Sequence, residues 1–309
     1  MRAEPFPAKS PAVSVVIATY NRAGLLPETI ESVLKQTFRD FELIVVDDGS
    51  TDDTEEVLKS YGDRLRYLRQ ENRGASAARN LGIRQSRASW ISIQDSDDIC
   101  APDHLETLFS FVESRPDCGM VFANGAYLDD PGPKGKKIIP PAKSKRLAEK
   151  GVELTDLFST SIVRLQAALL SREALLAVGG LDENLQICMD LDLAFRFFMR
   201  FPVAYLDKAV FFYRRHEGNI GLNQELRLLE NLRVIEKLIQ EFPSAIEIIG
   251  RQKINRRKAY RYYRLAKRRW KTGEKYGARE AIRQAVSLRP FFLKYHLYKV
   301  LGRFLVRGR

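Results

Sequence analysis

The sequence predicts an α/β protein with a mostly parallel sheet flanked by helices, followed by a basic helical C-terminal region. Three observations predict this fold class. Apolar runs rich in Val and Ile alternate with amphipathic segments early in the chain, an order typical of parallel sheets. Two of these runs end directly in groups of acidic residues. Residues 221–309 instead carry apolar residues at helical spacing among many Lys and Arg.

The first two strands each lead into a polar loop. The first predicted strand, 13–18, is followed by the loop 19–22 and an amphipathic helix. The second, 41–46, runs into a turn at Gly49, which permits a sharp reversal before the next helix. Because ligands of open α/β sheets bind at the carboxyl ends of strands, we expect these loops to converge on one crevice.

The remaining elements continue the alternation. Further strands are predicted at 65–69, 90–93, 119–123, 167–170 and 203–213. Further helices are predicted at 55–60, 76–86, 173–178, 190–201, 225–242, 253–270, 276–287 and 291–306. Pro, Gly and Lys concentrate in residues 129–145, which predicts an exposed loop, either a mobile lid or an inert surface segment.

The strongest chemical signal is Asp95-Ser96-Asp97-Asp98, which follows the apolar run 90–93. Burying unpaired carboxylates is costly, so such a cluster requires a cation or an exposed site. Asp95 and Asp97 are two residues apart and would share one face of an extended chain. Hard oxygen ligands of this kind suit Mg²⁺ or Mn²⁺. The alternative is an acidic turn that caps the helix predicted to start near Pro102.

Four segments of the chain resemble the family 2 glycosyltransferases. They are Pro11–Arg22, Val45–Asp52, Asn72–Asn80 and Asp95–Asp98. The resemblance implies the GT-A fold, a Rossmann-like nucleotide-sugar domain with a DxD metal site. It implies a catalytic domain over residues 1–220, with a nucleotide-sugar half at 11–124 and an acceptor half at 150–220. Residues 221–309 would form a separate basic helical region.

The resemblance also implies roles for the strand-end residues. Asp97, with the support of Asp95, is expected to hold Mn²⁺ or Mg²⁺. One of Asp47 and Asp48 is expected to accept a hydrogen bond from an imide N–H of the base, which favours UDP or dTDP sugars. The expected nucleotide-sugar contacts are Thr19, Tyr20, Asn21, Arg22, Asp47, Asp48, Arg79, Asp95, Ser96 and His216. Their structural alternatives are helix caps, a surface ion pair for Arg79 and a structural hydrogen bond for His216.

The acceptor half is expected to supply a general base. The segment 179–193 resembles the part of the family in which a Glu-Asp pair opens a helix and its Asp removes the acceptor proton. By position Asp190 is the base, and Asp192 is the second candidate. Met189 stands where the family usually has Glu, which leaves the base in place but puts its acceptor contacts in doubt. The alternative is that Asp190 is a favourable charge at a helix N-terminus.

Charge and cysteine content indicate the surroundings of the protein. The net charge is +12, yet residues 221–309 alone carry +16 (23 − 7) and the preceding residues −4 (28 − 32). Basic amphipathic helices of this kind favour an anionic membrane surface as partner and no nucleic acid, and the alternative is a solvated helical bundle or a dimer face. Three cysteines without a CxxC pair predict a reducing compartment. With no apolar signal segment or membrane-spanning run, we predict a cytoplasmic protein, peripheral on the inner face of the plasma membrane.

The sequence therefore predicts an inverting, metal-dependent glycosyltransferase. The motif Gln-x-x-Arg-Trp of the family's processive synthases does not occur, which favours transfer of a single sugar. The expected acceptor is a glycan or a lipid-linked glycan, in surface polysaccharide or glycolipid biosynthesis. One alternative is a nucleotidyltransferase of similar architecture, although the first strand is not followed by a Gly-rich phosphate loop. The other is a catalytically inactive nucleotide-sugar-binding scaffold, to which Met189 gives support.

Overall fold

A computed structural model describes residues 10–128 and 136–305. The chain divides into two compact units, Met1–Glu217 and Gly218–Arg309. Part of the predicted loop at 129–145 lies outside the described residues. The expectation for its end is wrong, because residues 141–150 form a helix with Pro141 at its first turn, where the missing N–H of proline costs nothing.

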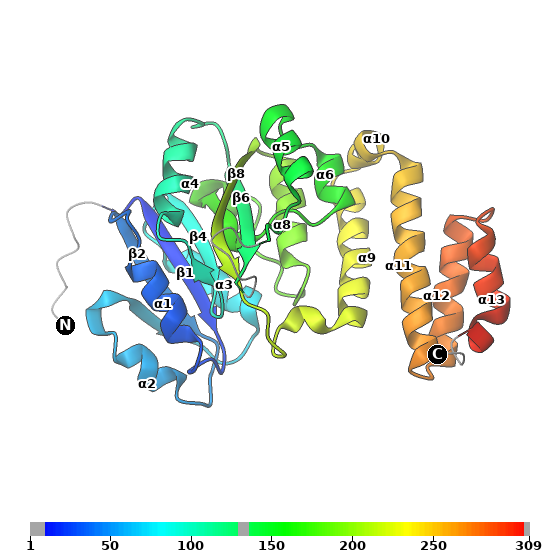
Figure 1. Ribbon diagram of the computed structural model, residues 1–309, viewed down its shortest axis with the longest axis horizontal. Coiled ribbons are helices and arrows are strands. Elements are labelled where there is room, and N and C mark those ends of the chain that lie inside the picture. Colours follow the sequence, from blue (N-terminus) through cyan, green and yellow to red (C-terminus); the bar gives the residue numbers. More distant parts are fainter. Residues whose placement is uncertain (1–9, 129–135, 306–309) are drawn as a thin grey trace. The chain divides into compact units, whose positions relative to one another are not determined.

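The first unit is built on one eight-stranded sheet (Figure 1). Its strand order is β3-β2-β1-β4-β7-β6-β8-β5. The strands are β1 Val13–Thr19, β2 Phe41–Asp47, β3 Arg66–Arg69, β4 Trp90–Asp95, β5 Ile99–Cys100, β6 Met120–Tyr127, β7 Ala168–Ser171 and β8 Val203–Tyr213. The four strands β3, β2, β1 and β4 are parallel, whereas β7 runs antiparallel between β4 and β6. The predicted mostly parallel sheet is confirmed.

The strand register aligns the polar strand ends. β1 is buried at every position, which suits an apolar strand with neighbours on both sides. Its last residue, Thr19, pairs with Asp47 of β2, and Ala18 pairs with Asp95 of β4. The chain turns to opposite sides of β1 to reach β2 and β4, so the strand order reverses at β1. Such a reversal is where open α/β sheets place a crevice.

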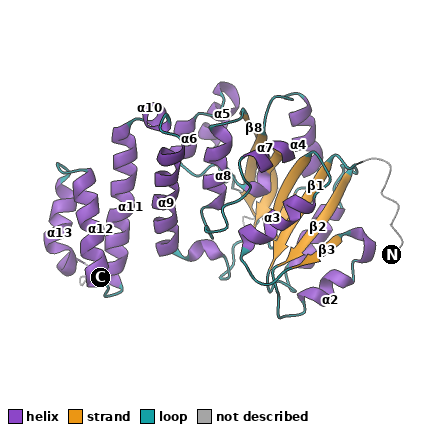
Figure 2. Ribbon diagram, turned by 180° about the vertical axis from the view of Figure 1, so that it is seen from behind, coloured by secondary structure: helices purple, strands orange, loops and turns teal. Residues whose placement is uncertain are grey.

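Helices cover both faces of the parallel strands. They are α1 Leu26–Leu34, α2 Thr54–Lys59, α3 Ala75–Gln85, α4 His104–Glu113, α5 Pro141–Lys150, α6 Leu154–Ser159, α7 Arg172–Ala177 and α8 Met189–Phe198, with 3₁₀ turns at Gly62–Arg64 and Leu165–Ala167. α1 and α4 pack on the face that carries Val15 and Ile17. α3 packs on the other face, which is turned toward the viewer in Figure 2. A Cβ on Gly82 of α3 would lie 2.4 Å from Val16, so the glycine permits this close packing.

The second unit is helical among its described residues. Its helices are α9 Gln224–Glu241, α10 Ala245–Ile249, α11 Arg251–Lys271, α12 Lys275–Leu288 and α13 Leu293–Leu305, after a 3₁₀ turn at Ile220–Leu222. Its core is made of aliphatic and aromatic residues: Leu228, Ala259, Leu265, Ala266, Ala281, Ile282, Ala285, Tyr295 and Tyr298. The predicted C-terminal helices are confirmed. None of the described helices is both long enough and apolar enough to cross a bilayer.

Candidate active site

The acidic pair at the end of β2 is held by the chain itself. Asp47 is fully buried, and its Oδ1 accepts a hydrogen bond of 2.8 Å from the backbone N–H of Ser50. Its Oδ2 lies 3.4 Å from the hydroxyl of Tyr67 and 3.8 Å from Nε of Arg69. This carboxylate therefore closes the turn that follows β2 and joins it to β3.

Asp48 performs the same task toward the next loop. Its Oδ1 accepts hydrogen bonds from Nε2 of Gln70 at 2.7 Å and from the backbone N–H of Arg73 at 2.9 Å. Its Oδ2 accepts the backbone N–H of Gly74 at 2.8 Å. Both carboxylates are thus occupied in shaping the loops, and the predicted contact with the base stays a prediction.

The loop after β1 is bound to the loop after β2. The backbone N–H of Asn21 donates to Oγ of Ser50 at 2.9 Å, and Oδ1 of Asn21 accepts the N–H of Thr51 at 2.8 Å. Asn21 adopts a positive φ of 50°, which Asn tolerates better than most residues. The hydroxyl of Thr19 is buried without a hydrogen-bond partner among the described residues. Tyr20 points outward and is 45% exposed. The predicted nucleotide loop is therefore a preformed turn.

A cavity of about 560 Å³ adjoins these loops. It is lined by Gly49 and by residues 69–72, at the ends of β2 and β3. Gly49 has a φ of 78°, and a Cβ there would lie 2.9 Å from the backbone nitrogen of Asn72. Any other residue would be strained and would push this wall of the cavity outward.

The acids after β4 form a compact cluster. β4 ends at Asp95 and a turn follows, so the extended geometry expected for Asp95 and Asp97 does not apply. The turn instead brings one carboxylate oxygen each from Asp95, Asp97 and Asp98 within 4.8 Å of one another. Ser96 lies in the same turn. Three hard oxygen ligands at such spacing are a suitable donor set for Mg²⁺ or Mn²⁺.

Asp95 is held between two donors. Arg79 of α3 forms an ion pair with its Oδ1, and Nε2 of Gln166 donates to its Oδ2. Burial raises the pKa of Asp95 to about 6, opposed by the Arg79 guanidinium and assisted by the charges of Asp97 and Asp190. In this structure the Arg79 guanidinium therefore neutralises the carboxylate of Asp95. The predicted phosphate contact of Arg79 is not tested.

Asp98 is the most deeply buried member of the cluster. Its Oδ1 accepts the backbone N–H of Arg214 at 2.9 Å, and its backbone carbonyl accepts the hydroxyl of Thr29 at 2.8 Å. Its Oδ2 is buried without a hydrogen-bond partner in the described chain. Burial and the neighbouring Asp95 raise the pKa of Asp98 to about 9. It does not cap α4, whose N-cap residue is Asp103.

The carboxylate of Asp97 lies beside side-chain nitrogens from two distant segments. Its Oδ2 lies 2.9 Å from Nε2 of His216 and 4.0 Å from the guanidinium of Arg22. Its backbone carbonyl accepts a hydrogen bond of 3.0 Å from Nε of Arg214. The loop after β1 and the loop after β8 thus meet at the acid cluster. Arg22 and His216 lie beside Asp97 there, as expected for residues of one site.

The start of α8 faces the same cluster. Sδ of Met189 accepts a hydrogen bond of 3.2 Å from Nη1 of Arg79, while Nε of Arg79 is buried without a partner among the described residues. Burial raises the pKa of Asp190, opposed by the positive charges of Arg79 and Arg164. Asp190 also raises the pKa of Asp95, so the two carboxyls are close enough to interact electrostatically.

Asp192, the second candidate for the base, has a structural place. It is almost fully buried, and its Oδ2 accepts Nε of Arg196 at 2.9 Å. Nη1 of Arg196 donates in turn to the backbone carbonyls of Val178 and Gly180 at 2.6 and 2.7 Å. Asp192 therefore helps to fix the loop before α8 through Arg196.

Sequence reasoning missed Arg164 and Gln166. Both lie between α6 and β7, in a segment without a recognised motif. Gln166 contacts Asp95, and the charge of Arg164 acts on both Asp98 and Asp190. His104 has a structural place, since it is fully buried with Nδ1 2.9 Å from the carbonyl oxygen of Val210. Burial lowers the pKa of His104 to about 4.

Comparison with protein-family models and curated sequences gives a consistent result. The model described as glycosyl transferase family 2 matches residues 14–178. An uncharacterized glycosyltransferase of Rickettsia prowazekii is 31% identical over 221 residues, covering 72% of this chain and 69% of the relative. The glycosyltransferase GlyG of Streptococcus pneumoniae is 41% identical over 125 residues, which cover 39% of this chain and 41% of GlyG.

Solved structures share the fold at low sequence identity. The crystal structure of residues 1–349 of TarS from S. aureus has a TM-score of 0.67 at 18% identity, covering 96% of this chain and 89% of that one. The same TarS segment in complex with UDP-GlcNAc has a TM-score of 0.61 at 17% identity, covering 94% and 91%. The mannosyltransferase PcManGT of Pyrobaculum calidifontis, in complex with GDP-Man and Mn²⁺, has a TM-score of 0.59 at 18% identity, covering 98% and 87%. At this identity the likeness concerns the fold alone.

Proposed function

The chain belongs to glycosyl transferase family 2, and we propose that it moves a single sugar, with inversion, from a nucleotide diphosphate sugar to a glycan or lipid-linked acceptor. One observation carries the proposal. The acid cluster of Asp95, Asp97 and Asp98 lies at the carboxyl end of β4, with Asp190 close enough to interact electrostatically with Asp95. A donor phosphate and an acceptor hydroxyl need such groups on opposite sides of the transferred sugar.

Asp97, with Asp95, is the proposed holder of a divalent cation. The cluster fits this task because its three oxygens are close together, and because Oδ2 of Asp98 is buried without a partner in the described chain. A neighbour of the same fold was solved with Mn²⁺, so Mn²⁺ or Mg²⁺ is the proposed cofactor. When bound, the ion would stabilise the negative charge of the departing nucleoside diphosphate.

The groups around the cluster are suited to a diphosphate. Arg22 and His216 approach Asp97 from two loops, and they are the proposed phosphate contacts. The cavity next to Gly49 is the proposed place for the base. UDP or dTDP sugars are our proposed donors. TarS, which shares the fold, was solved in complex with UDP-GlcNAc. GDP sugars are the alternative, because PcManGT was solved with GDP-Man.

Asp190 is the proposed general base. Burial raises its pKa, which increases its affinity for a proton and suits this role. In the proposed step the acceptor oxygen forms a bond to the anomeric carbon on the face opposite the diphosphate. The bond from that carbon to the phosphate oxygen breaks, and the nucleoside diphosphate leaves with the electron pair. The acceptor proton passes to Asp190, so atoms and charges balance.

The C-terminal unit is the proposed means of reaching the acceptor. Residues 221–309 carry a charge of +16 and form basic helices. We propose that they bind the anionic inner face of the plasma membrane, where lipid-linked glycans are elongated, so that the protein acts in the cytoplasm as a peripheral membrane enzyme. Surface polysaccharide or glycolipid biosynthesis is the proposed setting.

A thermal-shift experiment tests the donor site. The melting temperature of the full chain is measured with UDP, dTDP, GDP and CDP, each with Mn²⁺, Mg²⁺ or EDTA. Binding to the folded state raises the melting temperature by mass action. We expect a metal-dependent rise with one nucleotide. No rise with any of them would contradict the proposed donor site.

A second experiment tests the base. The Asp190→Asn variant keeps the size of the side chain but cannot accept the acceptor proton. We expect its rate of sugar transfer to fall by about a thousandfold, with donor binding by thermal shift unchanged. An active Asp190→Asn variant would remove Asp190 from its proposed role.

A further inference from the structure

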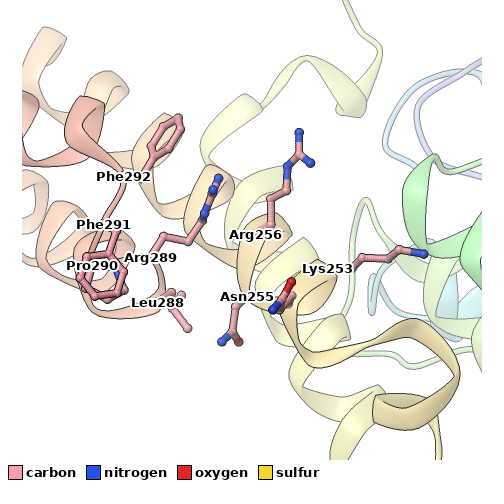
Figure 3. Close-up of a pocket in the computed structure, with 9 residues that line it drawn as sticks. Lys253, Asn255, Arg256, Leu288, Arg289, Pro290, Phe291 and Phe292 are labelled. Atoms are coloured by element: carbon pink, nitrogen blue, oxygen red, sulfur yellow. The ribbon is translucent and has the colours of Figure 1, made fainter.

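A second cavity lies in the C-terminal unit, apart from the strand-end crevice. Its volume is about 410 Å³, and it is enclosed by the start of α11 and the connection between α12 and α13. Figure 3 shows Arg256 and Asn255 reaching from α11 and Arg289 from the α12–α13 connection. Nothing in the proposed transfer reaction uses these residues.

The cavity is positively charged. Its lining includes Lys253, Arg256 and Arg289 and contains no acidic residue. The Arg289 guanidinium is stacked over the ring of Phe292, with its Cζ 4.4 Å from the ring centroid. The Arg289 side chain also donates a hydrogen bond to Tyr295, and its remaining N–H groups suit an oxyanion or phosphate. The cavity is therefore suited to a phosphate group.

The positive charge continues along one face of α11. Beyond Lys253 and Arg256, the residues at spacings of three or four are Tyr260, Arg264, Lys267 and Lys271, and all are exposed. Apart from Tyr260, these residues are cations, and none of the five has an ion pair among the described residues. By contrast, Lys258 of the same helix pairs with Glu236, and Arg269 pairs with Glu225. The acids of the unit thus neutralise other sides of α11 and leave this face uncompensated.

Exposed apolar side chains stand beside the cavity. Phe291, which lines it, is 100% exposed. On α13, Leu293, Leu297 and Val300 follow at helical spacing and are 70%, 49% and 70% exposed. Leaving a row of large apolar side chains in water is unfavourable, and such rows usually mark a binding surface.

We propose that this basic–apolar face, made of the exposed cations of α11, Arg289, Phe291 and the exposed row of α13, docks on an anionic phospholipid bilayer. A lipid phosphate would occupy the cavity, while Phe291 and the α13 row enter the interfacial region. The cations of this face would contact the anionic headgroups of the bilayer. Its exposed apolar side chains would contact the acyl chains beneath them. A second copy of the chain fits less well, because it would bring one +16 unit against another.

This inference rests on the proposed function, in which the acceptor lies at a membrane. It adds which surface of the protein binds that membrane. Co-sedimentation of the full chain with vesicles tests it. The vesicles contain phosphatidylcholine alone or phosphatidylcholine with phosphatidylglycerol. We expect binding to the anionic vesicles only, weakened by high salt because exposed charges are screened.

Matched variants locate the surface. Lys253→Gln with Arg256→Gln should weaken binding to the anionic vesicles about thirtyfold, since each cation near such a surface contributes measurably. The control, Lys275→Gln with Arg279→Gln, removes the same charge from exposed positions of α12 and should weaken binding at most about threefold. Phe291→Ala should weaken binding about tenfold, and Leu222→Ala, also at an exposed position, should leave it unchanged.

Three results with vesicles or variants would overturn the proposal. They are no binding to anionic vesicles, equal losses in the two charge pairs, and an effect of Phe291→Ala on self-association measured by light scattering with vesicle binding intact. Preferential binding of a single-stranded oligonucleotide over vesicles would also overturn it. All variants should keep the nucleotide-induced thermal shift, so a failure of docking is distinguishable from a failure of the donor site.

Discussion

The two acidic groups at the ends of β2 and β4 look alike in sequence but have opposite surroundings. Asp47 and Asp48 accept hydrogen bonds from backbone amides and side chains of their own loops. Asp95, Asp97 and Asp98 crowd together, and burial raises the pKa of two of them, Asp95 and Asp98. The first group stabilises the shape of the crevice. The second group is the proposed cation site, because burial and crowding disfavour its negative charges unless a cation is bound.

The largest expected effect is on the chemical group. Asp97→Asn should lower the rate of sugar transfer by about a thousandfold, because an amide is a poor ligand for a divalent cation. The Mn²⁺-dependent thermal shift with nucleotide should disappear with it. Asp63→Asn, at an exposed position of a 3₁₀ turn, is the matched control and should behave as the parent protein. A fully active Asp97→Asn variant would erase the distinction between the two groups.

The next effect belongs to the structural group. Asp48→Ala should lower the free energy of unfolding by about 3 kcal/mol, because it removes the buried carboxylate that accepts hydrogen bonds from Gln70, Arg73 and Gly74. Urea unfolding in EDTA measures it. Asp97→Ala should lower the free energy by less than about 1 kcal/mol, since it removes a charge from a crowded cluster. Equal losses in the two variants would contradict the comparison.

A smaller effect is expected for Gln166, which donates a hydrogen bond to Asp95 of the acid cluster. Gln166→Leu removes the hydrogen bond to Asp95, and we expect Mn²⁺ to bind about tenfold more weakly, as is usual when a ligand loses its hydrogen-bond partner. Titration calorimetry with Mn²⁺ measures the change. Gln85→Leu, at an exposed position of α3, serves as the control. Unaltered Mn²⁺ affinity in Gln166→Leu would mean that Asp95 needs no such support.

The smallest effect is a dependence of stability on pH. Because the pKa of Asp98 is raised to about 9 in the folded protein, folding takes up a proton above the ordinary pKa of an aspartate. This contribution to stability is complete below that ordinary pKa and is lost as the pH rises toward 9. In EDTA, Asp98→Asn should match the parent protein near pH 4. At pH 8 it should be more stable than the parent protein.

Urea unfolding at both pH values checks this prediction. Asparagine can keep the acceptor for the Arg214 N–H while carrying no charge. Added Mn²⁺ should stabilise the parent protein more than Asp98→Asn. A difference between the two proteins that does not change with pH would show that Asp98 is not protonated on folding.

Most of the fold was predictable because its signals are local. The apolar runs of β1, β2 and β4 and the polar residues that follow them are adjacent in sequence, and parallel strands align their carboxyl ends. Errors arose where helix and loop signals compete. The Pro- and Lys-rich segment that predicted a loop contains the start of α5, because proline is tolerated in the first turn.

The sequence by itself determined the α/β class, the helical C-terminal part, and the placement of the acids at strand ends. Only the tertiary structure decided the partners of these acids. Gln166 reaches Asp95 across 71 residues of sequence, and the backbone N–H of Arg214 reaches Asp98 across 116. Periodicity and turn chemistry extend over a few residues, whereas burial and charge act through space. For this reason two similar acidic motifs were distinguishable only after the chain had folded.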